Sequence, residues 1–208
     1  TPTKEPTEEI NYVFDTWKLT KIDNVDVTEE TEIPTSVTAN LEYTAMWKPM
    51  PIPTITHRPT EWTNTDVTVT ITSPDSEYSI EYRIDDNTDW LEYSNEFDVE
   101  QNCMIHARLA KQTNKGEEVD HEIDNIDKIK PQFNEKIVNT EKNDEAVITV
   151  KATDNLSGIV EYGIMKEGYA GQRTYTCENR LDTEIVFNEI YENGTYTLTL
   201  KDAAGNVN

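Results

Sequence analysis

A strand-like segment is written twice in this chain, and the two copies begin 80 residues apart, at positions 81 and 161. The first copy is Glu81-Tyr82-Arg83-Ile84 and the second is Glu161-Tyr162-Gly163-Ile164. Each follows a run rich in β-branched residues, 67–72 in the first case and 147–150 in the second. A domain-sized unit repeated in tandem, with no catalytic constellation common to both copies, is typical of proteins that provide length and display.

The bulk composition suits small modules rather than one large core. The 208 residues give room for two or three small domains, and the hydrophobic fraction is only 35%. Mean hydropathy is −0.73. The 41 acidic and 18 basic residues give a formal net charge of −23. Such a surface favours solubility and repels phosphate backbones and anionic lipid headgroups, so we expect no nucleic-acid partner.

The termini and the hydrophobic runs bear on location. No signal-peptide pattern, anchor motif or apolar run of transmembrane length is present, so we expect no direct membrane insertion. The chain opens on Thr1 and stops at Asn208, in what reads as a strand or its exit loop. We therefore expect a piece of a longer protein.

Alternating β-type runs predict an all-β chain of sandwich-like modules, because helical periodicity is nearly absent and Asn, Asp, Gly and Pro interrupt the runs at short spacing. Two proline-marked junctions, at 48–53 and 124–131, divide the chain. The predicted domains are residues 1–48, 49–127 and 128–208, the last truncated at its C-terminal end. Strands are expected near 54–57, 66–72, 78–84, 97–99, 103–109, 118–123, 133–138, 146–153, 159–166, 173–177, 183–187 and 195–201.

The second repeat carries a specific set of loop motifs. They are Asp127 and Pro131 at the entry, Ala152-Thr153-Asp154-Asn155-Leu156-Ser157-Gly158-Ile159 at one loop, and Asn193-Gly194-Thr195-Tyr196 leading to Lys201-Asp202-Ala203-Ala204-Gly205-Asn206. On these residues the repeat resembles the bacterial immunoglobulin-like modules that occur in tandem on surface proteins. The first repeat resembles the same group at 62–69, 90–93 and 125–127. It departs at its end, where aligning Leu109 with Leu200 puts Lys111 opposite Asp202.

The N-terminal 48 residues resemble a different module. Tyr12-Val13-Phe14-Asp15-Thr16-Trp17 and Leu41-Glu42-Tyr43-Thr44-Ala45-Met46-Trp47 are similar to the turn and the terminal strand of the β-grasp-like repeat of Listeria–Bacteroides type. The early strand and helix of that repeat have no counterpart here. The resemblance therefore implies a partial repeat, with an incompletely covered core around Phe14, Trp17 and Trp47.

The resemblance also implies a calcium site. Some bacterial immunoglobulin-like modules are stiffened by Ca²⁺ at their junctions through loop aspartates, and the corresponding residues here are Asp127, Asp154 and Asp202. Hard oxygen ligands from loops that meet at a domain end suit this ion. The alternative is that the three aspartates accept hydrogen bonds from their own turns, since EF-hand spacing is absent. No other cofactor is expected.

Aromatic residues offer a second kind of site, a surface on which sugar rings stack. The candidates are Trp62, Trp90 and Tyr93, with Tyr169 and Tyr175 in the second repeat. The alternative is that these rings pack in the core or at sheet edges, as most aromatics in β-rich chains do.

Catalysis is not expected. The only histidines are His57, His106 and His121, without metal-ligand spacing, and His106 lies out of phase with apolar Ile105 and Ala107, hence on the solvent face of its strand. Acidic residues are so abundant that pairs of carboxylates are expected by chance.

These patterns predict a non-enzymatic stalk or spacer of a secreted or cell-wall-attached bacterial surface protein, extracellular, whose partners are the neighbouring domains of the same polypeptide. Two alternatives stay open. One is an adhesive or carbohydrate-binding module, an adhesin-like part with a host protein, matrix protein or glycan as ligand. The other is an accessory region of a secreted glycoside hydrolase.

Overall fold

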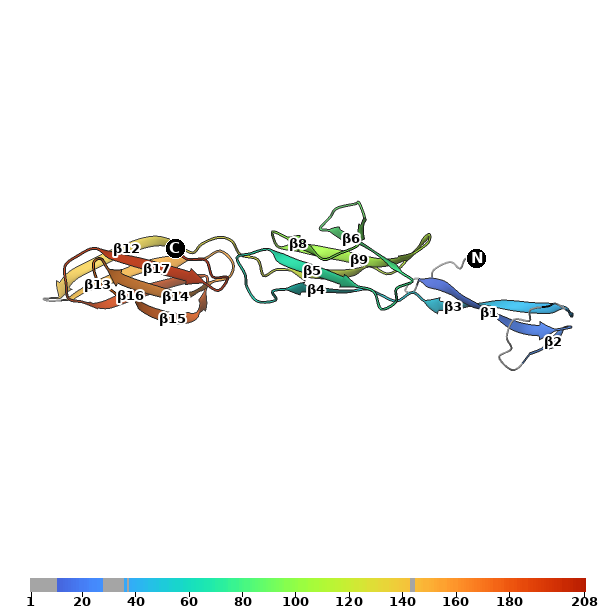
Figure 1. Cartoon of the computed structure of the whole chain (residues 1–208). Coiled ribbons are helices and arrows are strands. Elements are labelled where there is room, and N and C mark those ends of the chain that lie inside the picture. The colour runs from blue at the N-terminus through green and yellow to red at the C-terminus, as the bar shows by residue number, and fades with distance from the viewer. Residues whose placement is uncertain (1–10, 28–35, 37, 143–144) are drawn as a thin grey trace. The chain divides into compact units, whose positions relative to one another are not determined.

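The computed structural model describes residues 11–27, 36, 38–142 and 145–208, with backbone only for 140–142. Every regular element in these residues is a β-strand, which confirms the predicted all-β class (Figure 1). The described part of the chain contains no helix that could span a membrane. Contacts divide the chain into two compact units. They are residues 1–56, 70–96 and 104–121 for the first, and residues 57–69, 97–103 and 122–208 for the second.

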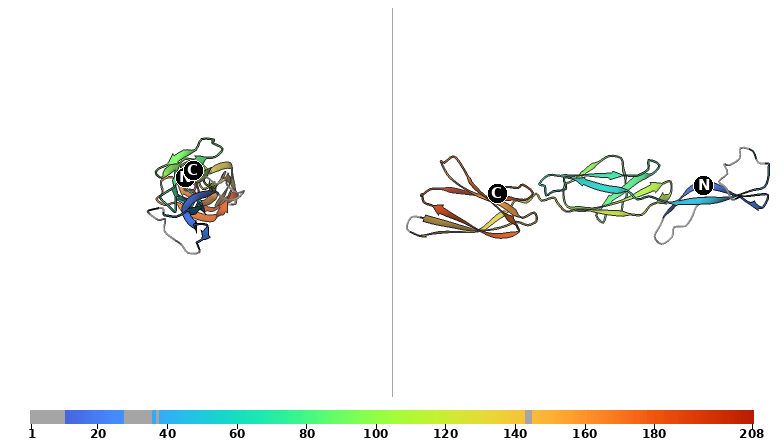
Figure 2. Two further views of the ribbon diagram at one scale, coloured as in Figure 1. Left: turned by 90° about the vertical axis from the view of Figure 1, so that its right-hand side faces the viewer. Right: turned by 90° about the horizontal axis from the view of Figure 1, so that it is seen from below.

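The second module, residues 132–208, has two three-stranded antiparallel sheets, which Figure 2 shows from a second side. One sheet has the order β12 (Gln132–Lys142), β13 (Glu145–Thr153), β16 (Asp182–Ile190). The other has the order β15 (Arg173–Arg180), β14 (Ile159–Lys166), β17 (Tyr196–Asp202).

The core of the second module lies between these sheets, because alternate residues of their strands point inward. In β13 the buried residues are Ile148, Val150 and Ala152, at the period of two that a strand imposes. They cluster with buried side chains of β14, β16 and β17: Ile159, Ile164, Ile185, Phe187, Ile190 and Leu200. The packing of one sheet face against the other makes this module a β-sandwich.

The first module, residues 54–123, repeats the strand order of the second. Its sheets are β4-β5-β8 and β7-β6-β9, with β10 and β11 also pairing β9. In both modules the first, second and fifth strands share one sheet and the fourth, third and sixth share the other, which is an immunoglobulin-like arrangement. The bounds are β4 (Thr54–Arg58), β5 (Val67–Thr72), β6 (Ser79–Ile84), β7 (Leu91–Tyr93), β8 (Phe97–Val99), β9 (Cys103–Lys111), β10 (Asn114–Lys115) and β11 (Val119–Ile123).

The twelve predicted strands are all present, with ends that differ by a few residues; β7 and β10 were not predicted. The two copies of the repeated segment are β6 and β14, as the spacing indicated. One predicted alignment is wrong. Asp202 pairs with Ile159, and Ser79, 80 positions earlier, pairs with Ala110. Leu200 pairs with Tyr162 and therefore corresponds to Ala107, the partner of Tyr82, and not to Leu109. The bulge at Ile159–Glu161 then shifts the register by one residue, so Ala110, rather than Lys111, occupies the place of Asp202.

The N-terminal residues form an antiparallel sheet in the order β2 (Val25–Asp26), β1 (Tyr12–Ile22), β3 (Leu41–Pro49). Phe14 contacts Trp17 and Trp47, with ring centres 5.5 and 6.0 Å away, and Trp17 remains 43% exposed. A partly covered aromatic cluster is thus present, as expected. Residues 1–10, 28–35 and 37 of the predicted 1–48 repeat lie outside the described residues, and the three-domain division stays a prediction.

A buried carboxylate cluster as the candidate metal centre

The fold brings three loops of the second module to one end of the sandwich. Gln132, the first residue of β12, pairs with Thr153, the last of β13. Ile159, which opens β14, pairs with Asp202, which closes β17. Antiparallel pairing therefore gathers the segment before β12, the β13–β14 loop and the turn after β17.

Each of these segments contributes one of the predicted aspartates. Asp127 lies before β12, Asp154 follows β13 and Asp202 ends β17. Their exposed fractions are 2%, 8% and 1%, and one carboxylate oxygen from each lies within 4.8 Å of the other two. Three charged groups buried together are rare in proteins unless they are paired or hold a metal.

Asp127 is held by backbone amides of two segments. The N–H of Ile129 donates to its Oδ1 and the N–H of Ser157 donates to its Oδ2, both at 2.9 Å. Its own N–H donates to the carbonyl of Thr63, which precedes β5 (2.9 Å). Asp127 thus joins the segment between β11 and β12 to the β13–β14 loop.

Asp154 is satisfied on one oxygen only. Its Oδ2 accepts the N–H groups of Leu156 (3.1 Å) and Gly158 (2.6 Å), which closes the loop on itself. Its Oδ1 is fully buried and has no hydrogen-bond partner. An ionised oxygen left without a partner in the interior costs free energy, so this atom marks the place where the cluster is incomplete.

Asp202 is held by Asn206, four residues further on. The N–H of Asn206 donates to Oδ1 (2.7 Å) and its side-chain Nδ2 donates to Oδ2 (2.8 Å). The same Nδ2 lies within hydrogen-bond distance of the carbonyl oxygens of Asp127 (2.8 Å) and Ile129 (3.4 Å). Asn206 therefore connects the turn after β17 to the segment that precedes β12.

No cation among the described residues forms an ion pair with these three carboxylates. Among the ion pairs recorded in the described part of the chain, none includes Asp127, Asp154 or Asp202. Burial raises the pKa of Asp202 above its usual value, the charges of Asp127 and Asp154 raise it further, and the bonds from Asn206 only partly oppose this.

The structure thus brings together all three predicted aspartates. It also shows the predicted turn role, because Asp127 and Asp154 each accept the amide of the residue two positions on. The sequence patterns did not single out Ser157 or Asn206 as part of the site. The motifs that contain them were visible, but nothing in their spacing shows that two loops 47 residues apart share a hydrogen bond, from the Ala204 N–H to Ser157 Oγ.

A second group of ionisable residues lies in the first module. His106 Nδ1 is 2.6 Å from Asp120 Oδ1 and 3.0 Å from Glu118 Oε1. Arg83 also pairs with Glu118, so a protein cation already occupies this group. His106 has the predicted phase on β9, but its side chain is only 14% exposed, because the two acids on or next to β11 cover it.

Of the predicted aromatic residues, Trp62, Trp90 and Tyr93 are half-buried, whereas Tyr169 and Tyr175 are exposed, by 58% and 39%. These residues do not belong to one unit. Trp62 falls in the second unit, whereas Trp90 and Tyr93 fall in the first. The guanidinium carbon of Arg108 lies 3.8 Å from the centre of the Trp90 ring, so a cation occupies a ring face that a sugar would need. The hydroxyl oxygen of Tyr93 accepts the N–H of Ile71 (3.1 Å).

A groove in the second module has a volume of about 620 Å³, and its charged lining groups are Lys136 and Glu192. Glu192 is paired with Lys166. The rest of the lining is mostly apolar, with Phe133, Val138 and Ile148 among the contributors.

No protein-family model matches the chain, and no curated protein matches it. Among solved structures, it is similar to the chicken interferon gamma receptor alpha chain, at 10% sequence identity over 76% of this chain and 95% of that chain, with a TM-score of 0.30. A likeness at that level carries no argument about fold or function. The strand orders themselves define the chain as a tandem of immunoglobulin-like β modules.

Proposed function

We propose that this chain is a non-enzymatic spacer of an extracellular protein, one that holds neighbouring domains of the same polypeptide at a distance. The observation that supports it most is the repetition of one strand order in two modules joined by a short segment, 124–131. Proteins built from such units gain length by adding copies.

The joining segment is fixed along its backbone rather than free. Thr63 N–H donates to the carbonyl of Asn125, and Asn102 makes two hydrogen bonds to the backbone of Ile126, at 2.8 and 3.0 Å. Lys128 pairs with Asp66 at 2.6 Å. A spacer benefits from such a connection, because a flexible linker of the same length would let its ends approach each other.

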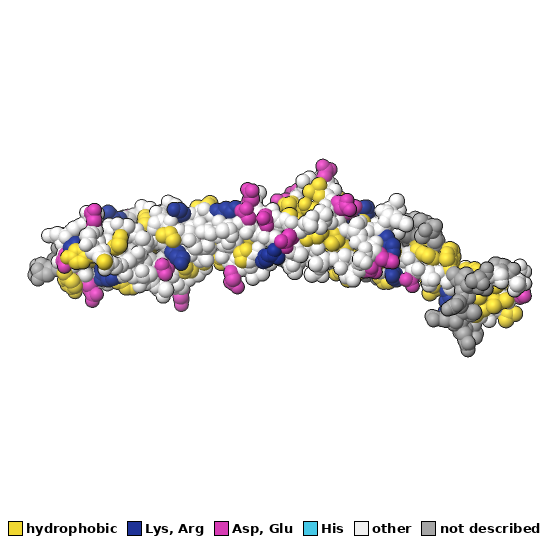
Figure 3. All heavy atoms as spheres, in the orientation of Figure 1, with side chains coloured by type: hydrophobic (Ala, Val, Ile, Leu, Met, Phe, Trp, Pro, Cys, Tyr) yellow, Lys and Arg dark blue, Asp and Glu magenta, His cyan; other side chains and the backbone are white. Residues whose placement is uncertain are grey.

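The charge distribution agrees with a role that avoids self-association. Acidic and basic side chains are interspersed on the face shown in Figure 3, and the net charge is −23. Repulsion between such chains keeps them apart at high local density.

We further infer that the modules are of the bacterial surface-protein type, secreted or attached to the cell wall, with a β-grasp-like repeat ahead of them. The support is the resemblance of the loops at 152–159 and 201–206, which are the loops that form the carboxylate cluster. The adhesive and carbohydrate-binding alternative is weaker, since Arg108 covers Trp90.

Small-angle X-ray scattering of the 208-residue chain tests the spacer role. A compact globule of this length has a radius of gyration of about 17 Å. A spacer should exceed about 25 Å and stay monomeric across a concentration series. A value near that of a compact globule, or concentration-dependent association, would overturn the proposal.

A further inference from the structure

We propose that Asp127, Asp154 and Asp202 bind one Ca²⁺ ion, and that this ion fixes the segment before β12 to the end of the second sandwich. The proposal does not depend on the spacer function. It rests on an oxygen that the protein leaves unsatisfied, on the set of ligands around it, and on the matching end of the first module.

The unsatisfied oxygen is Asp154 Oδ1. Asp154 is 92% buried, as its exposed fraction is 8%, and Oδ1 has no hydrogen-bond partner. Among the described residues, every donor to the three carboxylates is a backbone N–H or the Asn206 amide, so no described cation compensates the buried carboxylates. A bound cation resolves both problems at once.

The cluster has the capacity to act as a ligand set. An ionised carboxylate offers about four acceptor positions. Hydrogen bonds use two on each aspartate: one on each oxygen of Asp127 and Asp202, and both on Oδ2 of Asp154. The remaining positions receive no hydrogen bond from the described residues. The amides also orient the carboxylates, so little side-chain entropy remains to be lost on binding.

The origin of the ligands favours Ca²⁺ over Mg²⁺. Ligand oxygens on opposite sides of Ca²⁺ lie about 4.6–5.2 Å apart, because each bond is about 2.3–2.6 Å long; for Mg²⁺ the distance is about 4.1 Å, in a stricter octahedron. One oxygen from each aspartate falls within 4.8 Å of the other two, a limit that both ions satisfy. Ligands from three separate segments suit the ion with the more adaptable geometry.

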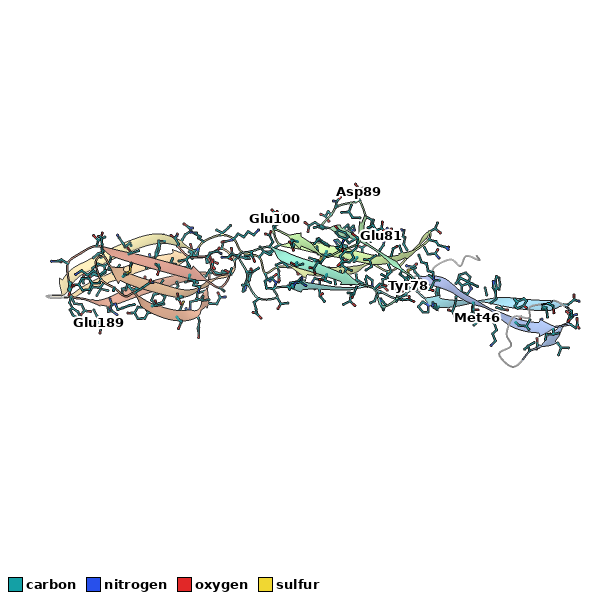
Figure 4. All side chains as sticks on the ribbon, viewed as in Figure 1. Met46, Tyr78, Glu81, Asp89, Glu100 and Glu189 are labelled. Atoms are coloured by element: carbon teal, nitrogen blue, oxygen red, sulfur yellow. The ribbon has the colours of Figure 1, made fainter. Side chains whose placement is uncertain are left out.

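The first module closes its corresponding end with apolar groups. Ala110 stands at the place of Asp202, and a buried cluster of Val13, Met50, Tyr78 and Leu109 packs there; Figure 4 labels Tyr78. The first module thus closes this end with apolar side chains, whereas the second module has the three carboxylates there. The proposal therefore predicts one ion per chain, not one per module.

The key variant is Asp154→Asn, which removes a charge and keeps the shape. Its amide oxygen can accept the Leu156 and Gly158 N–H groups, while its NH₂ group replaces Oδ1 and can donate to the other carboxylates. This variant should therefore fold without calcium. The matched control is Glu178→Gln, since the Glu178 side chain is 89% exposed and lies on β15.

The experiment combines native mass spectrometry with urea unfolding of the full chain, after chelation, in 150 mM KCl. Wild type and Glu178→Gln should bind one Ca²⁺. At a calcium concentration 100-fold above the dissociation constant, their folding equilibrium constant should rise about 100-fold. Asp154→Asn should show less than a threefold rise, and Mg²⁺ should bind wild type at least tenfold more weakly.

Each other outcome contradicts a part of the proposal. If wild type shows no stoichiometric binding, the site does not exist. An equal calcium response in Asp154→Asn would place the ion elsewhere on the acidic surface. Equal affinity for Mg²⁺ would contradict the proposed selectivity of the site for Ca²⁺. As a further readout, calcium should slow amide exchange at Ile129 and Ser157 in wild type about tenfold, and should leave it unchanged in Asp154→Asn.

Discussion

Asn206 caps two segments, the turn after β17 and the segment before β12. Its backbone and side-chain amides donate to Asp202, and the same side chain reaches the carbonyl of Asp127 at 2.8 Å. At 8% exposure, water cannot replace these bonds without opening the turn. An asparagine at this position is therefore required by its partners rather than by its own turn alone.

Asn206→Ala should lower the free energy of unfolding by about 2–3 kcal/mol, because it leaves the Asp202 carboxylate and the Asp127 carbonyl short of donors. Urea unfolding at pH 7 measures it. Asn134→Ala is the control, since Asn134 is exposed and bonds only Thr153 Oγ1 among the described contacts. Equal losses in the two variants would contradict the role assigned to Asn206.

Glu81 links two basic residues on the outer face of β6 (Figure 4). It pairs with Lys115 and with Arg108, the latter at 2.9 Å, and its side chain is 20% exposed. Burial acts to raise the pKa of Glu81, but the hydrogen bonds from Lys115 and Arg108 outweigh it, and the pKa is lowered from the usual 4.5.

A lowered pKa in the folded state means that the stabilisation by Glu81 is present above pH 4.5 and is lost as the pH falls through the folded value. Glu81→Gln should therefore cost about 1–2 kcal/mol at pH 7, and the difference from wild type should shrink between pH 5 and pH 3. Urea unfolding over that range checks it, with exposed Glu92→Gln as control. A difference that does not change with pH would refute it.

For single residues, the sequence predicted which residues belong to a site better than it predicted their contacts. The aspartates at 127, 154 and 202 stood out by resemblance, and the fold does gather them. The position of Arg108 over Trp90 could not be foreseen, because it depends on the register between β6 and β9. Likewise, the orphaned Oδ1 of Asp154 depends on which oxygen the loop amides select.

The β13–β14 loop depends on one glycine for its shape. Gly158 has a φ of +81°, and a Cβ there would lie 1.6 Å from Asn179 Oδ1. Asn179 in turn donates to the carbonyl of Ser157 at 2.6 Å. The backbone and a neighbouring strand thus both exclude a side chain at this position.

A pair of glycines separates these two effects. Gly168 has nearly the same φ, +82°, with nothing within 4 Å of its would-be Cβ. Gly168→Ala should cost about 1 kcal/mol from backbone strain alone. Gly158→Ala should cost about 3 kcal/mol, because it also displaces Asn179. Thermal or urea unfolding measures both, and equal losses would show that the Asn179 contact carries no cost.

Strands were predictable where alternation was long enough to read. β5 alternates Val67, Val69 and Ile71 inward, and the pattern is clear in the sequence. β7 and β10 were not predicted because strands of three and two residues are too short to show an alternating pattern. The bulge between Ile159 and Glu161 was not predicted either. It shifts the pairing register between β14 and β17 by one residue, and this changes which residue of the first module corresponds to Asp202.

Across the whole molecule, the segment from Asp124 to Pro131 decides how the repeat is connected. Its sequence showed a proline-marked junction between the two repeats. The structure adds that the backbone of this junction bonds to side chains and carbonyls from distant positions in the sequence. Thr63 forms a parallel bridge with Ile126, and Asn206 bonds the carbonyl of Asp127. These long-range partners leave no local pattern in the sequence.

Asn102 offers the sharpest test of that connection. Its side-chain amide accepts a hydrogen bond from the Ile126 N–H and donates one to the Ile126 carbonyl, which is how a neighbouring β-strand would pair with this residue. Asn102→Ala should raise amide exchange at Ile126 and Asp127 by about tenfold while leaving core amides such as Val150 unchanged, because one local contact is lost and the sandwich is not. Exchange monitored by NMR measures this, with Asn134→Ala as control. If Ile126 keeps its protection from exchange in Asn102→Ala, the Thr63 bridge alone holds the segment. If Val150 loses protection as well, the segment and the second module unfold together. The connection would then be part of the core of the second module and not a joint between modules.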